Sequence, residues 1–104
     1  MIKKHTLSVG LNDKDTKTQK IQTIEAYKIL MNVLVSVGYD GATVTESTGL
    51  YRHQDGQFTI EKSLVIDILF AEDEKTNKLI DILKRALNQE TIALQTSVIE
   101  SKLV

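Results

Sequence analysis

The sequence predicts an α+β two-layer sandwich, in which two helices cover one face of a single sheet. Apolar residues alternate in four segments and recur at helical spacing in two others, and these segments follow the order β-α-β-β-α-β. The stretch from Ala42 to Phe70 reads as one hairpin of about 13 residues per strand, where an ordinary strand has about 5–6. A chain of 104 residues is expected to form one domain, spanning 1–104.

The N-terminal part is expected to supply one strand, a loop and one helix. From His5 to Leu11 apolar and polar residues alternate, which is typical of a half-buried strand. The polar stretch 12–20 is expected to form the loop. The helix is predicted from Gln19 to Val37, and Gly38 follows it where a helix-terminating glycine belongs. Its apolar residues at helical spacing are Tyr27, Leu30, Met31, Leu34 and Val37.

The hairpin is expected to turn at Asp55-Gly56, because Asp-Gly between alternating strands is a strong signal for a two-residue turn. On the return strand one parity is apolar and marks the core-facing side: Phe58, Ile60, Leu64, Ile66, Ile68 and Phe70. With such a turn, the inward-facing residues of the outgoing strand are odd-numbered near the tip, as at Tyr51, but even-numbered further back, as at Val44. The alternation is therefore offset by one residue between these two positions. The sequence therefore predicts a bulge at Gly49, with positive φ, which restores the register and makes the tip lean away from the body.

The C-terminal part is expected to add a helix over roughly Asp73 to Asn88 and a strand over Thr91 to Ile99. The acidic start and basic end of this helix match the helix dipole. Two right-handed crossovers around a central hairpin make the arrangement ferredoxin-like: a βαββαβ two-layer sandwich with an extended hairpin between the second and third strands.

With both helices on one side, the other face of the sheet, here called the open face, is left uncovered. It is expected to carry Thr6, Ser8, Thr43, Thr45, Ser63, Val65, Asp67, Leu69, Ala93, Gln95, Ser97 and Ile99. A face this neutral is typical of a surface that meets another subunit, so a homo-oligomer is expected. A solvated face rich in Thr and Ser is the alternative.

Composition excludes several classes of function. A net charge of -1 and a pI near 6.1 give no case for binding nucleic acid or a membrane surface. The absence of Cys excludes disulfides and thiol chemistry. No apolar run suggests a signal peptide or membrane span, so a cytoplasmic location is expected. His5 and His53 are too few for a zinc site within one chain that lacks Cys, and a site shared between subunits stays open as the alternative.

Side chains capable of chemistry concentrate at the hairpin. The candidate ligand- or partner-binding residues are Gly49, Tyr51, Arg52, His53 and Glu61. The predicted register brings Arg52 close to Glu61, and cross-strand pairing of this kind contributes about 0.2–1 kcal/mol per pair. Pairing explains the residue types but not the hairpin's length, so contact with a ligand or partner stays open beside it. No catalytic residue is assigned.

One stretch resembles the segment that leads into the long loop of PII signalling proteins. It runs from Val37 to Arg52 and reads Val-Gly-Tyr-Asp-Gly-Ala-Thr-Val-Thr-Glu-Ser-Thr-Gly-Leu-Tyr-Arg. The related CutA proteins share the architecture, and a family of small bacterial proteins of unknown function is similar around Gly49 to Asp67. The resemblance to PII and CutA implies a homotrimer with open faces turned inward and effectors bound in clefts between subunits.

The sequence departs from PII proteins where they bind ATP, in a loop rich in Gly and Lys before the last strand. Here the corresponding stretch reads Ala86-Leu87-Asn88-Gln89-Glu90-Thr91, with neither residue type. A phosphate site needs unhindered backbone N–H groups and positive charge, and Glu90 opposes an anion. ATP is therefore not predicted, and the cofactor is unknown.

The sequence favours a PII-like regulatory or adaptor module of bacterial signal transduction. It is expected to be an oligomer, trimer rather than dimer, that contacts a small-molecule effector or a protein partner through its hairpin. The alternative is a small oligomeric α+β-barrel enzyme of the monooxygenase or isomerase type. Such an enzyme would have a cleft near the hairpin and use His53, Tyr51 or Glu61 as acid or base.

Overall fold

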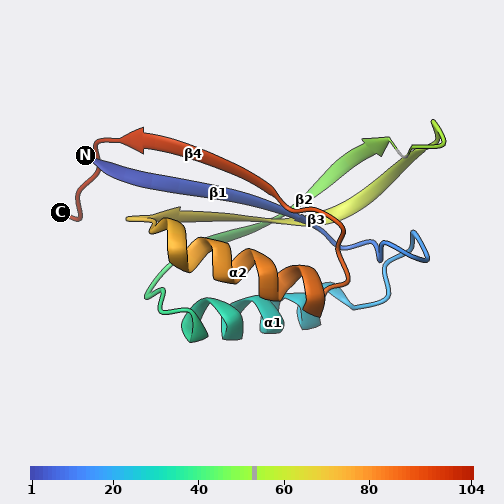
Figure 1. Cartoon of the computed structure of the whole chain (residues 1–104), viewed down its shortest axis with the longest axis horizontal. Coiled ribbons are helices and arrows are strands. Elements are labelled where there is room, and N and C mark those ends of the chain that lie inside the picture. The colour runs from blue at the N-terminus through green and yellow to red at the C-terminus, as the bar shows by residue number, and fades with distance from the viewer. Residues whose placement is uncertain (53) are drawn as a thin grey trace.

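The computed structural model describes residues 1–52 and 54–104. Its elements are β1 (Ile2–Gly10), α1 (Thr23–Ser36), β2 (Thr43–Arg52), β3 (Phe58–Leu69), α2 (Asp73–Ala86) and β4 (Ala93–Ile99). The strands form one antiparallel sheet in the order β2-β3-β1-β4, and both helices lie on the same face of it (Figure 1). The predicted ferredoxin-like α+β sandwich is confirmed. No helix in the described part of the chain has the length and apolarity needed to cross a bilayer.

The core fills the space between the helices and the sheet. Successive side chains alternate across a strand, so the odd residues of β1 and the even residues of β3 face the helices. The buried residues include Leu7, Val9, Ala26, Leu30, Leu34, Leu64, Ile66, Ile68, Leu79 and Leu83. Full burial of one such large side chain stabilises the fold by roughly 1.5–3 kcal/mol. The pairing of strands also places the residues predicted for the open face on the side away from the helices.

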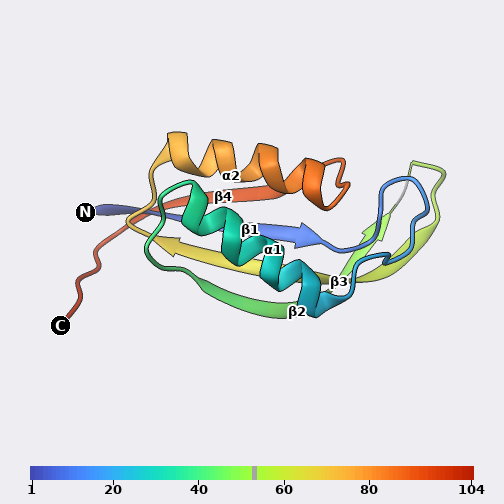
Figure 2. The same ribbon diagram turned by 90° about the horizontal axis from the view of Figure 1, so that it is seen from below.

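Strands β2 and β3 form the long hairpin that the sequence predicts. Its outer part, Thr48–Arg52 with Phe58–Lys62, is here called the arm; it projects beyond the helices and bends toward the open face (Figures 1 and 2). The β2–β3 register is continuous over its whole length, so the predicted bulge at Gly49 is wrong. Because β2 ends at Arg52 and β3 begins at Phe58, the connection is longer than the predicted two-residue turn. This extra length, rather than a bulge, accounts for the one-residue slip. In that connection Gly56 has a φ of +87°, whereas Gly49 has no positive φ.

The pairs near the tip are displaced by one residue from the prediction. Tyr51 lies opposite Thr59, and Arg52 lies opposite Phe58. A shift of one residue moves a side chain to the other face. Arg52 and Glu61 therefore point to opposite faces of the arm, and their predicted proximity is wrong.

The apolar parity of β3 is core-facing only where the helices cover it. The even residues from Leu64 to Ile68 are buried, whereas Phe58 and Ile60 are 62% and 72% exposed. Leu50, which pairs with Ile60, is 69% exposed. Phe70, just past the end of β3, is 47% exposed. The prediction is thus confirmed in the middle of β3 and wrong at its two ends.

A polar cluster is buried where β1 meets the start of α2. His5 Nδ1 and Thr76 Oγ1 are 2.7 Å apart, and Thr76 Oγ1 is also 2.6 Å from the Tyr39 hydroxyl. The Tyr39 hydroxyl in turn accepts a hydrogen bond from the Glu72 N–H at 3.0 Å. His5 Nε2 lies 3.2 Å from Asp73 Oδ1. These groups, here called the closed cluster, join the sheet to α2 through a chain of hydrogen bonds.

Candidate functional site

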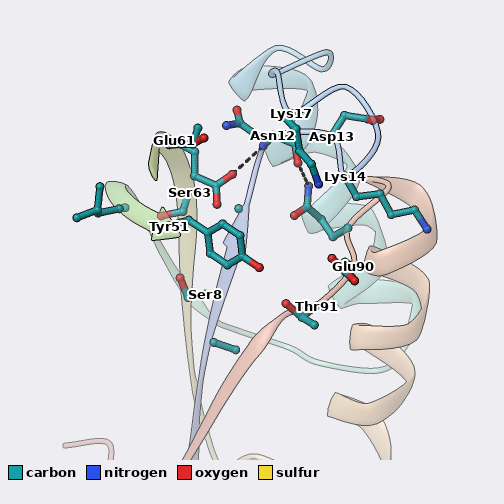
Figure 3. Close-up of a pocket in the computed structure, with 16 residues that line it drawn as sticks. Ser8, Asn12, Asp13, Lys14, Lys17, Tyr51, Glu61, Ser63, Glu90 and Thr91 are labelled. Carbon is teal, nitrogen blue, oxygen red and sulfur yellow. Dashed lines mark hydrogen bonds between the residues drawn. The ribbon is translucent and has the colours of Figure 1, made fainter. Parts of the chain in front are cut away.

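A cavity of about 250 Å³ lies where the arm leaves the body, on the open face. Its walls come from the end of β1, the loop after β1, the two strands of the arm, and the connection between α2 and β4. The labelled side chains in Figure 3 are Ser8, Asn12, Asp13, Lys14, Lys17, Tyr51, Glu61, Ser63, Glu90 and Thr91. The cavity combines carboxylates, hydroxyls, amines and one aromatic ring.

Glu61 lies in the floor of this cavity, between two glycines. Gly49 is its direct partner on β2, and Gly10 approaches it from β1. A Cβ on Gly10 would lie 2.5 Å from Glu61 Oε1, so the carboxylate rests against bare backbone. The Asn12 N–H donates a hydrogen bond to Glu61 Oε2 at 3.1 Å. The missing side chain of Gly10 thus leaves the room that the Glu61 carboxylate occupies.

Tyr51 forms the wall next to Glu61. It lies two residues beyond Gly49 on the same face of β2 and is a diagonal neighbour of Glu61, a spacing of about 7–8 Å that aromatic and long side chains bridge. Figure 3 shows its ring over the cavity, with the hydroxyl directed toward Glu90 and Thr91 on the other wall. An aromatic face and a carboxylate therefore border the same space.

The wall opposite the arm is fixed by hydrogen bonds between two loops. Asp13 Oδ1 accepts from the N–H groups of Asp15 and Thr16 at 2.9 and 3.1 Å, and Asp13 Oδ2 accepts from the Asn88 amide at 2.8 Å. The Asn88 amide, followed by the two backbone N–H groups, lowers the pKa of Asp13 from 3.8 to about 2. Asp13 is therefore an anion that ties the loops together.

The charges around the cavity are mixed. Lys14 and Lys17 come from the loop after β1, and Figure 3 shows Lys14 extending outward from it. Glu90 lies beyond Tyr51 in the connection before β4. Glu61 forms no ion pair with any described residue. No group of three or more His, Asp or Glu residues within 1–52 and 54–104 is arranged to hold a metal ion.

Three of the five candidate residues from the sequence meet at this cavity: Gly49, Tyr51 and Glu61. Arg52 lies on the opposite face of the arm, where its guanidinium carbon is 5.7 Å from the centroid of the Phe58 ring. His53 lies outside the described residues.

The sequence reasoning missed the walls that the two loops supply. Asn12 holds Glu61, and Asn88 holds Asp13 across 75 positions of sequence. No local pattern signals such a long-range pairing. Asn88 has a positive φ of 48°, a turn conformation that Asn adopts more readily than most residues. An Asn after the second helix is therefore a signal for a turn, but it does not indicate the bond to Asp13.

Comparison with known families decides the classification of the chain. A family model described as "Protein of unknown function (DUF3574)" matches residues 4–102. The chain belongs to this family. No protein of curated function matches it.

Several solved structures are similar to this DUF3574 protein in fold. A phage SAM lyase in complex with S-methyl-5'-thioadenosine is 22% identical, with a TM-score of 0.70 over 91% of this chain and 79% of the lyase chain. The periplasmic divalent cation tolerance protein CutA from Archaeoglobus fulgidus is 13% identical, with a TM-score of 0.64 over 96% of this chain and 87% of CutA. The GlnK–ATP complex of B. subtilis is 12% identical, with a TM-score of 0.56 over 92% and 84% of the two chains. The resemblance to CutA and PII proteins is thereby confirmed for the fold.

Proposed function

We propose that the protein is an oligomeric, PII-like binding module that holds a small-molecule effector at the base of its arm. The observation that carries this proposal is the position of the cavity between two parts of the molecule. Tyr51 and Glu61 line the cavity from the arm, and the loops of the body form the opposite wall. A ligand that fills the space contacts both parts, so its binding energy would favour one orientation of the arm over others.

The candidate residues divide between two roles in this proposal. Gly49, Tyr51 and Glu61 contact the effector, because they line the cavity. Arg52 and His53 contact a protein partner at the end of the arm. The exposed Leu50, Phe58 and Ile60 lie on the same face as Arg52 and would add apolar area to that contact. The arm then reports the state of the cavity to the partner.

The oligomer is a homotrimer in this proposal, as the resemblance to PII and CutA implies. Its contact surface is the open face, on which Val65, Leu69 and Ile99 are apolar and Thr and Ser are frequent. Each subunit contributes one domain, 1–104, to a bacterial, cytoplasmic signalling protein. Sedimentation equilibrium tests this part directly, and a monomer at micromolar concentration would reject it.

An enzyme is the second candidate, favoured by one specific observation. The phage SAM lyase gives a higher TM-score than the CutA and GlnK structures, 0.70 against 0.64 and 0.56. Tyr51 and Glu61 are groups that could transfer a proton or stabilise charge in the cavity. Chromatography of S-adenosylmethionine incubated with the protein separates the candidates: release of methylthioadenosine supports a lyase, and unchanged S-adenosylmethionine supports the binding module.

The main test compares two glycine substitutions in a thermal-shift panel of nucleosides, nucleotides and amino-acid derivatives. Gly49→Val places a side chain in the cavity lining, where the nearest atom to a new Cβ is 4.0 Å away. Gly41→Val is the matched control, because a Cβ there meets nothing within 4 Å and Gly41 lies outside the cavity. We expect an effector to raise the Tm of the wild type and of Gly41→Val but not of Gly49→Val. Equal shifts in all three proteins would place the ligand elsewhere.

A further inference from the structure

We infer that the effector carries a permanent positive charge, of the sulfonium or quaternary ammonium kind, held between the Glu61 carboxylate and the Tyr51 ring. The inference rests on the proposed function, since it names the class of ligand for the same cavity. It is carried by three features of that cavity: the state of Glu61, the ring beside it, and the charges of the remaining lining.

Glu61 differs from the other carboxylates on β2 and β3 in having no cationic partner among residues 1–52 and 54–104. Asp67 lies 3.7 Å from Lys4, and Glu46 lies 3.8 Å from Lys62. Glu61 instead receives one backbone hydrogen bond, from the Asn12 N–H, and is part-buried in the cavity floor. Withdrawing a carboxylate from water without a counter-charge costs free energy. A cationic ligand removes that cost when it binds.

The position of Glu61 is also fixed before any ligand arrives. The Asn12 N–H holds one oxygen, and the other packs closely over Gly10, where a Cβ would lie 2.5 Å from Oε1. A carboxylate held in one place loses little conformational freedom on binding. Preorganisation of this kind favours binding over solvation of the free group.

Tyr51 supplies the second contact for a cation. The face of an aromatic ring attracts positive charge, and tyrosine is among the rings that recognise quaternary ammonium groups. Glu61 and Tyr51 are diagonal neighbours on one face of the arm, so one compact group can touch both. A sulfonium or quaternary ammonium suits this pair, because it needs no hydrogen-bond acceptor for each of its substituents.

The rest of the lining disfavours an anion at this end of the cavity. Asp13 stays ionised, since its hydrogen bonds lower its pKa to about 2, and Glu90 adds a further carboxylate. The lining thus holds three carboxylates, Asp13, Glu61 and Glu90, against two lysines, Lys14 and Lys17, of which Lys14 extends outward, away from Glu61 and Tyr51 (Figure 3). The volume of about 250 Å³ is small compared with drug-sized pockets of about 300–1,000 Å³, so it suits a compact head group.

The test uses two ligands that differ mainly in charge: S-adenosylmethionine, a sulfonium, and S-adenosylhomocysteine, the neutral thioether. Isothermal titration calorimetry is run on the wild type, on Glu61→Gln, and on Glu100→Gln, an exposed position outside the cavity. We expect the wild type and Glu100→Gln to prefer the sulfonium by about tenfold or more, which corresponds to about 1.4 kcal/mol. Glu61→Gln should lose this preference while its affinity for the thioether is unchanged. Circular dichroism confirms that each variant is folded.

A second pair extends the test to ligands without adenosine: choline and its uncharged analogue 3,3-dimethylbutan-1-ol. Preference for choline that depends on Glu61 supports the inference even when neither adenosyl compound binds. Equal affinity for the charged and neutral members of a pair overturns it, and so does the absence of binding by every cation tried. If neutral or anionic molecules raise the Tm in a Gly49-dependent manner while cations do not, the inference fails and the proposed function stands. If no molecule in either panel acts through Gly49, the proposed function fails as well.

Discussion

Strand β1 connects two polar regions of the molecule. In one, the closed cluster, polar side chains bond mainly to each other, although His5 Nε2 has only the Asp73 carboxylate, at 3.2 Å, beside it and no hydrogen bond to a described residue. In the other, a carboxylate lines a cavity. In the closed cluster, His5 and Thr76 are 1% and 0% exposed, and each bonds to another buried group. At the other end of β1, Glu61 faces a cavity with one backbone N–H as its partner. Buried polar groups that bond one another stabilise the fold, whereas a preorganised group that lines a cavity is available to a ligand. We therefore expect substitutions in the closed cluster to change stability, and substitutions at the cavity to change binding.

Thr76→Val should give the largest loss of stability. Valine keeps the shape of threonine but removes the hydroxyl that contacts both His5 and Tyr39. Tyr39 keeps its bonds to the Glu72 backbone, so His5 is left without its Nδ1 partner. A buried polar group that loses its partner costs about 1–3 kcal/mol. Urea denaturation measures this as a lower midpoint at an unchanged m-value.

The control for this substitution is Thr48→Val, the same change at an exposed position of β2. It should alter the free energy of unfolding by no more than about 0.5 kcal/mol. If both variants have the same urea midpoint, the hydrogen bonds of the closed cluster do not contribute to the free energy of unfolding beyond the packing of its side chains.

Asp13→Asn should weaken the protein in a way that depends on pH. The hydrogen bonds lower the pKa of Asp13 from 3.8 to about 2, so the unfolded chain binds a proton more readily than the folded one. The stabilisation is complete above a pH of about 4, and it is lost as the pH falls through about 2. The variant is therefore expected to be less stable than the wild type near neutral pH and to converge with it in acid. Thermal melts from pH 7 to pH 2 measure both effects.

Asp81→Asn serves as the reference for this pH series, because it makes the same change of charge at an exposed site on α2. A constant difference between wild type and Asp13→Asn across the whole range would mean that the Asn88 bond does not bias the protonation of Asp13.

The two glycines beside Glu61 should respond differently to alanine. At Gly10 the new Cβ would meet the Glu61 carboxylate at 2.5 Å, so the side chain must move and its bond to the Asn12 N–H is disturbed. At Gly49 the nearest atom is 4.0 Å away and no positive φ has to be kept. Gly49→Ala should therefore be neutral or stabilise slightly, because glycine within a strand is less favourable than a residue with a side chain.

Thermal denaturation of the two variants tests this contrast. It also tests the bulge predicted at Gly49, because a residue with a side chain would cost about 1–3 kcal/mol there if φ were positive. If the melting temperature falls more for Gly49→Ala than for Gly10→Ala, the result would support the bulge that the sequence predicts at Gly49.

The sequence was sufficient for the parts of the fold that depend on local pattern. Periodicity gave the order of the elements, and the parity of Leu64 to Ile68 gave the buried side of β3, because helices cover that stretch. Parity alone does not say where the covering ends, so Phe58 and Ile60 were assigned to a core that does not reach them.

Only the part of the site that lies on one hairpin was predictable from the sequence. Tyr51, Gly49 and Glu61 stood out as chemistry-bearing or glycine positions on one hairpin, and they do line one cavity. The Asp-Gly signal marks a turn but not its length, so the register at the tip, and with it the face of Arg52, came out shifted by one residue. The opposite wall depends on the bond from Asn88 to Asp13, which periodicity does not encode.

Arg52→Ala should have the smallest effect, and it sharpens the contrast between the two faces of the arm. Its guanidinium lies near the Phe58 ring in an exposed position, where a cation–π contact contributes about 0.5–1 kcal/mol at most. Because Arg52 points away from the cavity, effector affinity measured by calorimetry should stay within about twofold of the wild type, well under the 1.4 kcal/mol of a tenfold change. Tyr51→Ala, one residue earlier and on the cavity face, should weaken the same affinity by about tenfold or more. If Arg52→Ala weakens effector affinity and Tyr51→Ala does not, the strands pair at the tip as predicted from sequence, and Tyr51 does not line the cavity.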